Sequence, residues 1–168
     1  KKKILTSATQ KVRVPKFVGL TNPVYINYLK EVESQLEVKA IISPSKDKLE
    51  TLVQALDHLG NQPGIIFCNF KESIRRVSEH LTANNISHGC FYGGMEQKDR
   101  ERALIKFRNG THQLIIATDL AARGIDVDGL AYVVHYQLPD QIEYYTHRSG
   151  RTARAGKSGL SLSLVTKD

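Results

Sequence analysis

The sequence predicts an α/β domain with a doubly wound, mainly parallel sheet of about six strands and helices on both faces. Short apolar, β-branched runs alternate along the chain with longer amphipathic segments, which is the pattern of βαβ units. The chain has 168 residues, of which 40% are hydrophobic and 24% charged. It therefore has the size of one ordinary domain and enough apolar residues for a core.

The alternating runs place the elements in order. Strands are expected at Val38–Ser43, Ile65–Cys68, Ser87–Tyr92, Leu114–Ala117, Tyr132–Val134 and Leu160–Val165. Helices are expected at Lys46–Leu59, Lys71–Ala83 and Glu96–Arg108, and a further helix opens at Pro139 and carries the arginine-rich segment. The last strand alternates apolar residues with serine, so one of its faces is expected to be exposed.

Two further patterns predict helix ends. Asn109 and Gly110 are typical of a left-handed cap at the end of the third helix. Asp140 and Glu143 have the spacing of a capping box at the start of the last helix.

The beginning of the chain does not read like the start of a domain. Ile4–Thr9 resembles a strand end with a small-hydroxyl turn, and Gln10–Asn22 is basic and has no clear period. We therefore expect residues 1–22 to be the end of a preceding domain and a linker, and 23–168 to form the compact domain.

Charge and cysteine usage narrow the functional classes. The chain has 24 Lys and Arg against 17 Asp and Glu, a net charge of +7 that favours a polyanionic partner.

No stretch is long and apolar enough for a membrane span or a signal peptide, so we expect a cytoplasmic protein without a membrane partner. Cys68 and Cys90 lack metal-binding spacing and are expected to be buried, reduced thiols, with no metal site.

The arginine-rich segment is the strongest functional signal. Three arginines and one histidine, without any acid, lie within His147–Arg154. In a helix, His147, Arg151 and Arg154 would share one face, which would repel itself unless an anion lay opposite. Guanidinium groups match phosphate oxygens well. A solvated basic helix end would account for one or two of these side chains, but not for all of them.

Other polar clusters follow the predicted strands. Ligands of a doubly wound sheet bind beyond the carboxyl ends of its strands, so these loops are candidate sites. Asn69 is either a phosphate ligand or an ordinary helix cap. Gly93 and Gly94, followed by Gln97 and Arg100, permit close approach of a phosphodiester backbone, although a plain turn would have the same sequence.

The segment Thr118–Asp126 is unusually polar for a structural loop, which favours a functional role. The Gly-Lys-Ser at Gly156–Ser158 is not a phosphate-binding P-loop, because Arg151 stands where its first glycine is required. The sequence also lacks an Asp-Glu pair at a strand end that could hold Mg²⁺. The sequence therefore contains basic residues for one side of a nucleotide-binding site and lacks the P-loop and the Mg²⁺-binding acids of the other side.

These segments together resemble the C-terminal RecA-like domain of DEAD-box ATP-dependent RNA helicases. Thr6–Thr9 is similar to the Ser-Ala-Thr motif, and Ala117–Asp126 and His147–Gly156 are similar to motifs V and VI. Ile65–Asn69 looks like motif IV, and Gln97 with Arg100 like the Gln-x-x-Arg motif. The chain departs from the family at Phe70, where many members have threonine, at Tyr92, where histidine is frequent, and at Ser149, which replaces an aliphatic residue.

The resemblance implies a role for each matching position. Arg151 and Arg154 would be arginine fingers for ATP, whose Mg²⁺ would be held mainly by the N-terminal RecA-like domain. Asp126 would bind the ribose, and Arg123 would bridge toward that domain. RNA would be bound by Asn69, Gly94, Gln97, Arg100 and Thr118. Coupling between the two sites would involve Ser7, Thr9, His147 and Arg148.

The expected function is therefore the C-terminal half of an ATP-dependent RNA helicase that is inactive without its N-terminal domain. Its partners would be RNA and that domain. Two alternatives stay open: a related helicase or ATPase domain that acts on DNA, and a non-enzymatic module that binds RNA or protein.

Overall fold

The computed structural model describes residues 35–127, 129–154 and 156–167, which form one six-stranded sheet in the order β1-β6-β5-β2-β4-β3. Every pair of neighbouring strands is parallel. The predicted fold class is confirmed. The predicted segment 1–22, with Ser7 and Thr9, and the predicted boundary at residue 23 lie outside the described residues.

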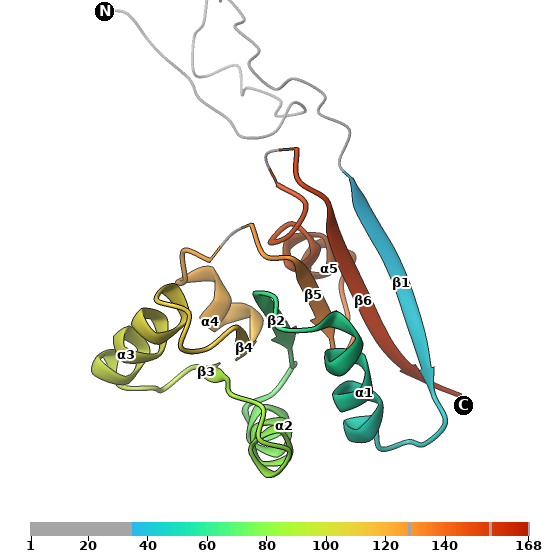
Figure 1. The fold of residues 1–168 in the computed structure, drawn as a ribbon, viewed down its shortest axis with the longest axis horizontal. Coiled ribbons are helices and arrows are strands. Elements are labelled where there is room, and N and C mark those ends of the chain that lie inside the picture. The colour runs from blue at the N-terminus through green and yellow to red at the C-terminus, as the bar shows by residue number, and fades with distance from the viewer. Residues whose placement is uncertain (1–34, 128, 155, 168) are drawn as a thin grey trace, which may run out of the picture. The chain divides into compact units, whose positions relative to one another are not determined.

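Helices and strands alternate along the chain (Figure 1), and the only helix that the sequence did not predict within the described residues is α4, which lies in the segment expected to be a loop. The strands are β1 (Leu36–Ser43), β2 (Gly64–Phe67), β3 (Gly89–Phe91), β4 (Leu114–Ala117), β5 (Tyr132–His135) and β6 (Gly159–Thr166). The helices are α1 (Leu49–Leu59), α2 (Lys71–Ala83), α3 (Gln97–Arg108), α4 (Asp119–Arg123) and α5 (Ile142–Ser149).

Two apolar clusters fill the space on the two faces of the sheet. On one face, Leu52 of α1 and Val77 of α2 pack with Ile66 and Val134. On the other face, Ala121 of α4 packs with the buried residues of β2, β4 and β5, and Leu104 of α3 lies against them. The α5 helix covers the same face as α3 and α4, because its Ser149 and Tyr145 reach Ser161 of β6. Helices thus cover both faces, as predicted.

The α1 helix begins later than predicted, at Leu49 rather than Lys46. The Asp47 carboxylate accepts the backbone N–H of Leu49 at 3.2 Å, and the Lys48 ammonium donates to the Leu164 carbonyl at 2.9 Å. These bonds hold the residues before Leu49 in turns that cap the helix.

The prediction that β6 has an exposed face is wrong. This strand lies between β1 and β5, and Ser161 and Ser163 are buried. The Ser161 hydroxyl pairs with His135 of β5 at 3.0 Å and with Ser149 of α5 at 2.9 Å. Ser161 therefore alternates with leucines because its hydroxyl meets buried polar partners, and not water.

The last helix also ends before the predicted point. It closes at Ser149, with Gly150 as its C-cap, so Arg151 and Arg154 lie beyond it and do not share a helical face with His147. Thr152 instead forms a parallel bridge to Leu130, and Ala153 has a left-handed φ of 53°. The capping box is wrong as well, since Gln141 is the N-cap residue and no side-chain bond caps the helix. The predicted left-handed cap at Gly110 is confirmed by its φ of 78°.

Candidate functional site

A buried arginine organises the carboxyl edge of the sheet. The Arg148 side chain is 1% exposed and makes a bidentate pair with Asp119, with N–O distances of 2.7 and 2.6 Å. It also donates to the Gln137 carbonyl at 2.7 Å and to the Asn69 amide oxygen at 2.8 Å. Its guanidinium carbon lies 5.1 Å from the centre of the Phe67 ring.

The partners of Arg148 come from three different loops. Asn69 follows β2, Asp119 follows β4 and Gln137 follows β5, and these strands are neighbours in the sheet. A buried charge is costly unless it is paired and hydrogen-bonded, and here the guanidinium has both kinds of partner. Arg148 therefore fixes the three loops relative to one another.

Asn69 is fully engaged within the protein. Its amide nitrogen donates to the Leu138 carbonyl at 2.9 Å, its amide oxygen accepts from Arg148, and its backbone N–H donates to the Gln137 side chain at 2.9 Å. It is not the N-cap residue of α2, which is Phe70. In this structure Asn69 thus positions the loop after β2.

Arg151 lies at the other end of α4. Its guanidinium donates to the Ala122 carbonyl at 2.9 Å and to the Ile125 carbonyl at 3.1 Å, which are at and just beyond the C-terminal turn of that helix. The α4 helix is thus held at its first residue by Arg148 and at its end by Arg151. The two arginines are three residues apart in sequence, and together they bracket a helix of five residues.

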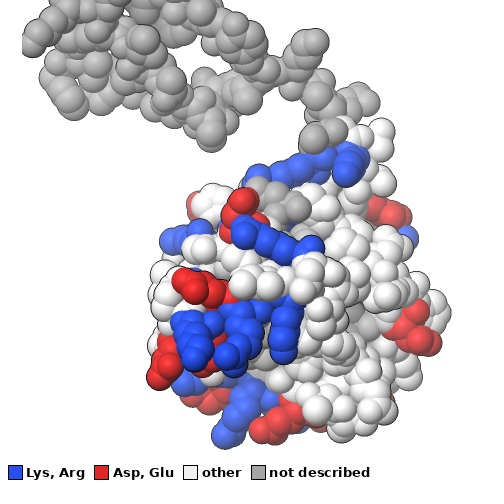
Figure 2. Space-filling model, turned by 60° about the vertical axis from the view of Figure 1, so that its left-hand side comes forward, with Lys and Arg blue, Asp and Glu red and all other residues white. Residues whose placement is uncertain are grey.

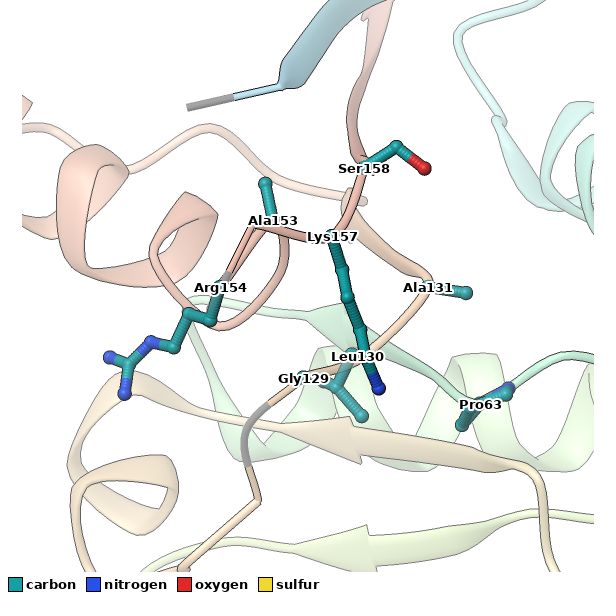
Figure 3. A pocket seen from close by; sticks show the side chains of 8 residues that line it. All are labelled: Pro63, Gly129, Leu130, Ala131, Ala153, Arg154, Lys157 and Ser158. Atoms are coloured by element: carbon teal, nitrogen blue, oxygen red, sulfur yellow. The ribbon is translucent and has the colours of Figure 1, made fainter. Parts of the chain in front are cut away.

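Arg154 borders a cavity of about 330 Å³ near the amino ends of β2, β5 and β6. Pro63, Leu130 and Ser158, which precede these strands, line the same cavity. In Figure 3 the exposed side chains of Arg154 and Lys157, which both lie between α5 and β6, point in different directions. The Arg154 Nε donates to the Gly150 carbonyl. A strongly basic turn thus borders this hollow.

Asp126 is also remote from the carboxyl ends of the strands. Its side chain is 89% exposed and lies 3.9 Å from the Arg108 guanidinium. It lines a hollow with Pro63 and Gln113, which precede β2 and β4. Ligands were expected beyond the carboxyl ends of the strands, but Asp126 and Arg154 lie near the amino ends, because each follows a helix, α4 or α5, that leads the chain back across the sheet.

The other candidate residues lie on loops at the carboxyl edge. Gly94 has a φ of 88°, and the position that a Cβ would occupy there is open. Gln97 donates to Glu101 at 2.9 Å on the exposed side of α3. Thr118 is the N-cap of α4, and its backbone N–H donates to the Phe91 carbonyl at 3.2 Å. This bond joins the loop after β4 to the end of β3.

Arg100 connects α3 with the segment after α4. One of its guanidinium nitrogens lies 2.9 Å from the position that a Cβ on Gly124 would occupy. The absence of a side chain at Gly124 therefore leaves the space that Arg100 fills. Arg123 extends over the Tyr144 ring of α5, at 5.1 Å from its centre, and His147 is exposed on the same helix.

Sequence reasoning missed three residues of this site. Asp119 and Gln137 are partners of Arg148, and Tyr144 holds Arg123. The acidic residue beside the predicted Thr118 was a detectable signal, because an acid within a basic site usually pairs with one of its arginines. Gln137 and Tyr144 carry no such signal, since their roles depend on segments that are distant in sequence.

A buried histidine lies beside the arginine network. His135 is fully buried, its Nδ1 is without a hydrogen-bond partner, and its ring stacks on Tyr145 at 4.4 Å. The pKa of His135 is lowered from 6.5 to about 4, mainly by burial and also by the positive charge of Arg148, while the negative charge of Asp119 opposes the shift. The neutral ring accordingly belongs to the folded core at neutral pH.

Lys and Arg side chains gather on the face that comes forward in Figure 2, with acidic side chains at their margin. The α3 helix lies on this side and has Lys106 and Arg108 in its last turn.

Among residues 35–127, 129–154 and 156–167, no group of three His, Cys, Asp or Glu could hold a metal ion. Within the same ranges, no helix has the length and apolar character to cross a membrane. Cys68 and Cys90 are free thiols, as predicted, but only Cys68 is fully buried.

The sequence profile described as "Helicase conserved C-terminal domain" matches residues 47–156, which include Arg148 with its partners and both Arg151 and Arg154. The chain belongs to this family. It is 36% identical over 147 residues to the DEAD-box ATP-dependent RNA helicase CshB of Bacillus subtilis, covering 86% of this chain and 34% of that protein. The chain thus spans about a third of the length of this curated relative, and 38% of the CshB helicase of Listeria monocytogenes.

Solved structures agree with this assignment to the helicase C-terminal domains. The C-terminal domain of the DEAD-box protein Dbp5 is 26% identical, with a TM-score of 0.71, and the match covers 82% of this chain and 79% of that chain. Saccharomyces cerevisiae Dbp5 bound to RNA and ADP BeF3 is 26% identical, with a TM-score of 0.71, over 83% of this chain and 38% of that chain. The resemblance to DEAD-box C-terminal domains is thereby confirmed.

Proposed function

We propose that this domain works as the C-terminal half of an ATP-dependent RNA helicase, together with an N-terminal RecA-like domain. The observation that carries the proposal is the double anchoring of α4. Arg148 holds its first residue among the loops at the carboxyl edge, and Arg151 holds its end near Asp126. The α4 helix thereby joins the carboxyl edge of the sheet to the surface near Asp126, and we propose a different ligand for each of these two surfaces.

RNA is the proposed ligand of the carboxyl edge. Gly94, Thr118 and Arg100 offer an open backbone, a hydroxyl and a guanidinium on adjacent loops. Such groups suit sugar and phosphate contacts, which are largely independent of sequence. The RNA present in the related Dbp5 complex supports this ligand.

ATP is the proposed ligand of the opposite surface, shared with the N-terminal domain. Arg154 and Arg151 provide planar donors that suit a polyphosphate, and the exposed Asp126 provides acceptors for ribose hydroxyls. Guanidinium groups placed there would stabilise charge on the transferred phosphoryl group. Mg²⁺ would be held mainly by the other domain, because the described residues contain no group of three His, Cys, Asp or Glu that could hold a metal ion.

Coupling between the surfaces is assigned to His147 and Arg148, with Ser7 and Thr9 near the beginning of the chain. Arg123, now stacked on Tyr144, would leave that ring to bridge toward the N-terminal domain when the two domains close. The setting we propose is the cytoplasm, where RNA and ATP are both abundant.

The test compares this chain with its two-domain parent in an ATPase assay. The parent should release phosphate faster with RNA than without it, and the 168-residue chain alone should not turn over ATP. Greater stimulation by DNA would favour the DNA-dependent alternative. A parent without ATPase activity at saturating RNA would favour the non-enzymatic binding module.

A further inference from the structure

An aromatic residue at the carboxyl edge has no structural role in the core. Phe70 follows β2 and is 62% exposed. Among the described residues, the aromatic stacking and cation–π contacts involve other rings, and Phe70 takes part in none of them. Aromatic side chains are enriched at binding surfaces, where their faces stack on flat ligands.

The backbone on both sides of Phe70 is fixed. Asn69 before it is held by Arg148, Gln137 and the Leu138 carbonyl. Phe70 itself is the extended N-cap residue of α2, and its carbonyl accepts the N–H of the buried Ile74 at 3.2 Å. The ring is thus carried by a rigid segment, which reduces the entropy lost when a flat ligand stacks on it.

The residue after Phe70 is a lysine that reaches toward the proposed RNA surface, and the acidic Glu72 follows it. The exposed Lys71 extends its ammonium over the Tyr92 ring, at 4.7 Å from its centre. This contact brings the start of α2 beside the loop after β3, which leads into Gly94. A cation next to an exposed ring is the combination that binds single strands, through phosphate attraction and base stacking.

We propose that Phe70 is a stacking platform for one nucleobase of a single-stranded RNA bound at the carboxyl edge. The inference rests on the proposed function and adds a base contact to a surface that otherwise reads the backbone. Leu120 and Leu138 are also exposed, and each follows a member of the Arg148 network, so an apolar protein surface is the competing reading. The aromatic face, the adjacent lysine and the net charge of +7 favour nucleic acid.

The experiment measures the affinity of the chain for two fluorescent decamers at low ionic strength by anisotropy. One decamer is oligouridylate, and the other has the same ribose-phosphate backbone without bases. Aromatic stacking contributes roughly 5- to 150-fold per base, and for an exposed ring we expect the lower end. Phe70→Ala should therefore weaken binding of oligouridylate about fivefold and leave binding of the abasic decamer unchanged, whereas Phe70→Trp should retain it.

The matched control is Ile42→Ala, which removes a 56% exposed apolar side chain from β1, far along the sheet order from β3. It should alter neither affinity, and thermal melts should show that all variants are folded. Equal weakening of both decamers by Phe70→Ala, or no change in either, would overturn the stacking inference alone. The second result would leave a protein partner as the explanation of the exposed ring. Failure of the unaltered two-domain protein to bind either decamer would overturn the proposed function as well.

Discussion

Arg148 and Arg154 belong to the same basic segment but meet opposite environments. Arg148 is buried with four hydrogen bonds to partners from three loops, and Arg154 is exposed beside a hollow at the amino ends of the strands. Both have the same charge and the same donor geometry. The difference teaches that burial and partners, rather than residue type, separate an arginine that holds the fold from one available to a ligand.

This comparison assigns different consequences to the two residues. Loss of Arg148 leaves the Asp119 carboxylate, which is only 23% exposed, without its partner. Loss of Arg154 removes an exposed donor at the surface. The first change should affect folding, and the second should affect activity.

The largest effect is expected for Arg154 in the two-domain protein. Arginine fingers contribute about 10³–10⁵ in rate, or roughly 4–7 kcal/mol of barrier. Arg154→Ala should lower single-turnover ATP hydrolysis at saturating RNA within this range, and Arg154→Lys should lose part of it because lysine lacks the fork. The melting temperature should stay unchanged. A rate within about threefold of the unaltered protein would contradict the role of Arg154 as an arginine finger. Arg151 would then be the candidate, and the functional difference between Arg148 and Arg154 would be smaller.

The next effect is on stability. Arg148→Met should lower the free energy of unfolding by about 3–5 kcal/mol, because it leaves a partly buried carboxylate unpaired. Urea denaturation followed by circular dichroism measures this change. Arg75→Met is the control, since its exposed pair with Glu79 should contribute at most ~1 kcal/mol.

A second variant sharpens this result. Adding Asp119→Leu to Arg148→Met removes the orphaned charge and should recover part of the lost stability. If the double variant is as unstable as the sum of the two single ones, the pair is not the source of the effect.

The buried His135 gives a pH dependence of intermediate size. Its pKa of about 4 in the folded protein is below its ordinary value of 6.5, so the unfolded chain binds more protons in this window. Stability should therefore fall as the pH drops from 6.5 toward 4, by ~3 kcal/mol in total. His135→Phe should remove this part of the pH dependence in urea denaturation while keeping the stack on Tyr145. The same slope in the variant would assign the effect to other groups.

The smallest effect concerns the proposed RNA surface. Arg100→Ala should reduce the magnitude of the slope of log affinity against log salt by about one, as expected for one phosphate contact. Arg102→Ala removes the same charge from the exposed side of α3 and serves as the control, with a smaller change in slope. Equal slopes for the two variants would indicate that Arg100 packs against Gly124 and does not contact a phosphate.

The sequence predicted the elements well where periodicity determines them. The bounds of α2 and β4 were predicted to the residue, because α2 has apolar residues at helical spacing and β4 is a continuous apolar run between polar residues. The prediction that one face of β6 is exposed was wrong, because alternating serine and leucine give the same pattern whether a serine contacts water or a buried histidine. The network of Arg148 could not be predicted, since its partners are 11, 29 and 79 residues away in sequence.

The Arg148 network also determines when the loops of the carboxyl edge lose their freedom. Asn69, Asp119 and Gln137 are bound to Arg148 within the folded domain itself, so the conformational entropy of these segments is lost on folding and not on binding. A strand of RNA that docks there finds its contacts already arranged. Any increase in RNA affinity caused by ATP must therefore come from the placement of the second domain, because these loops have little left to order.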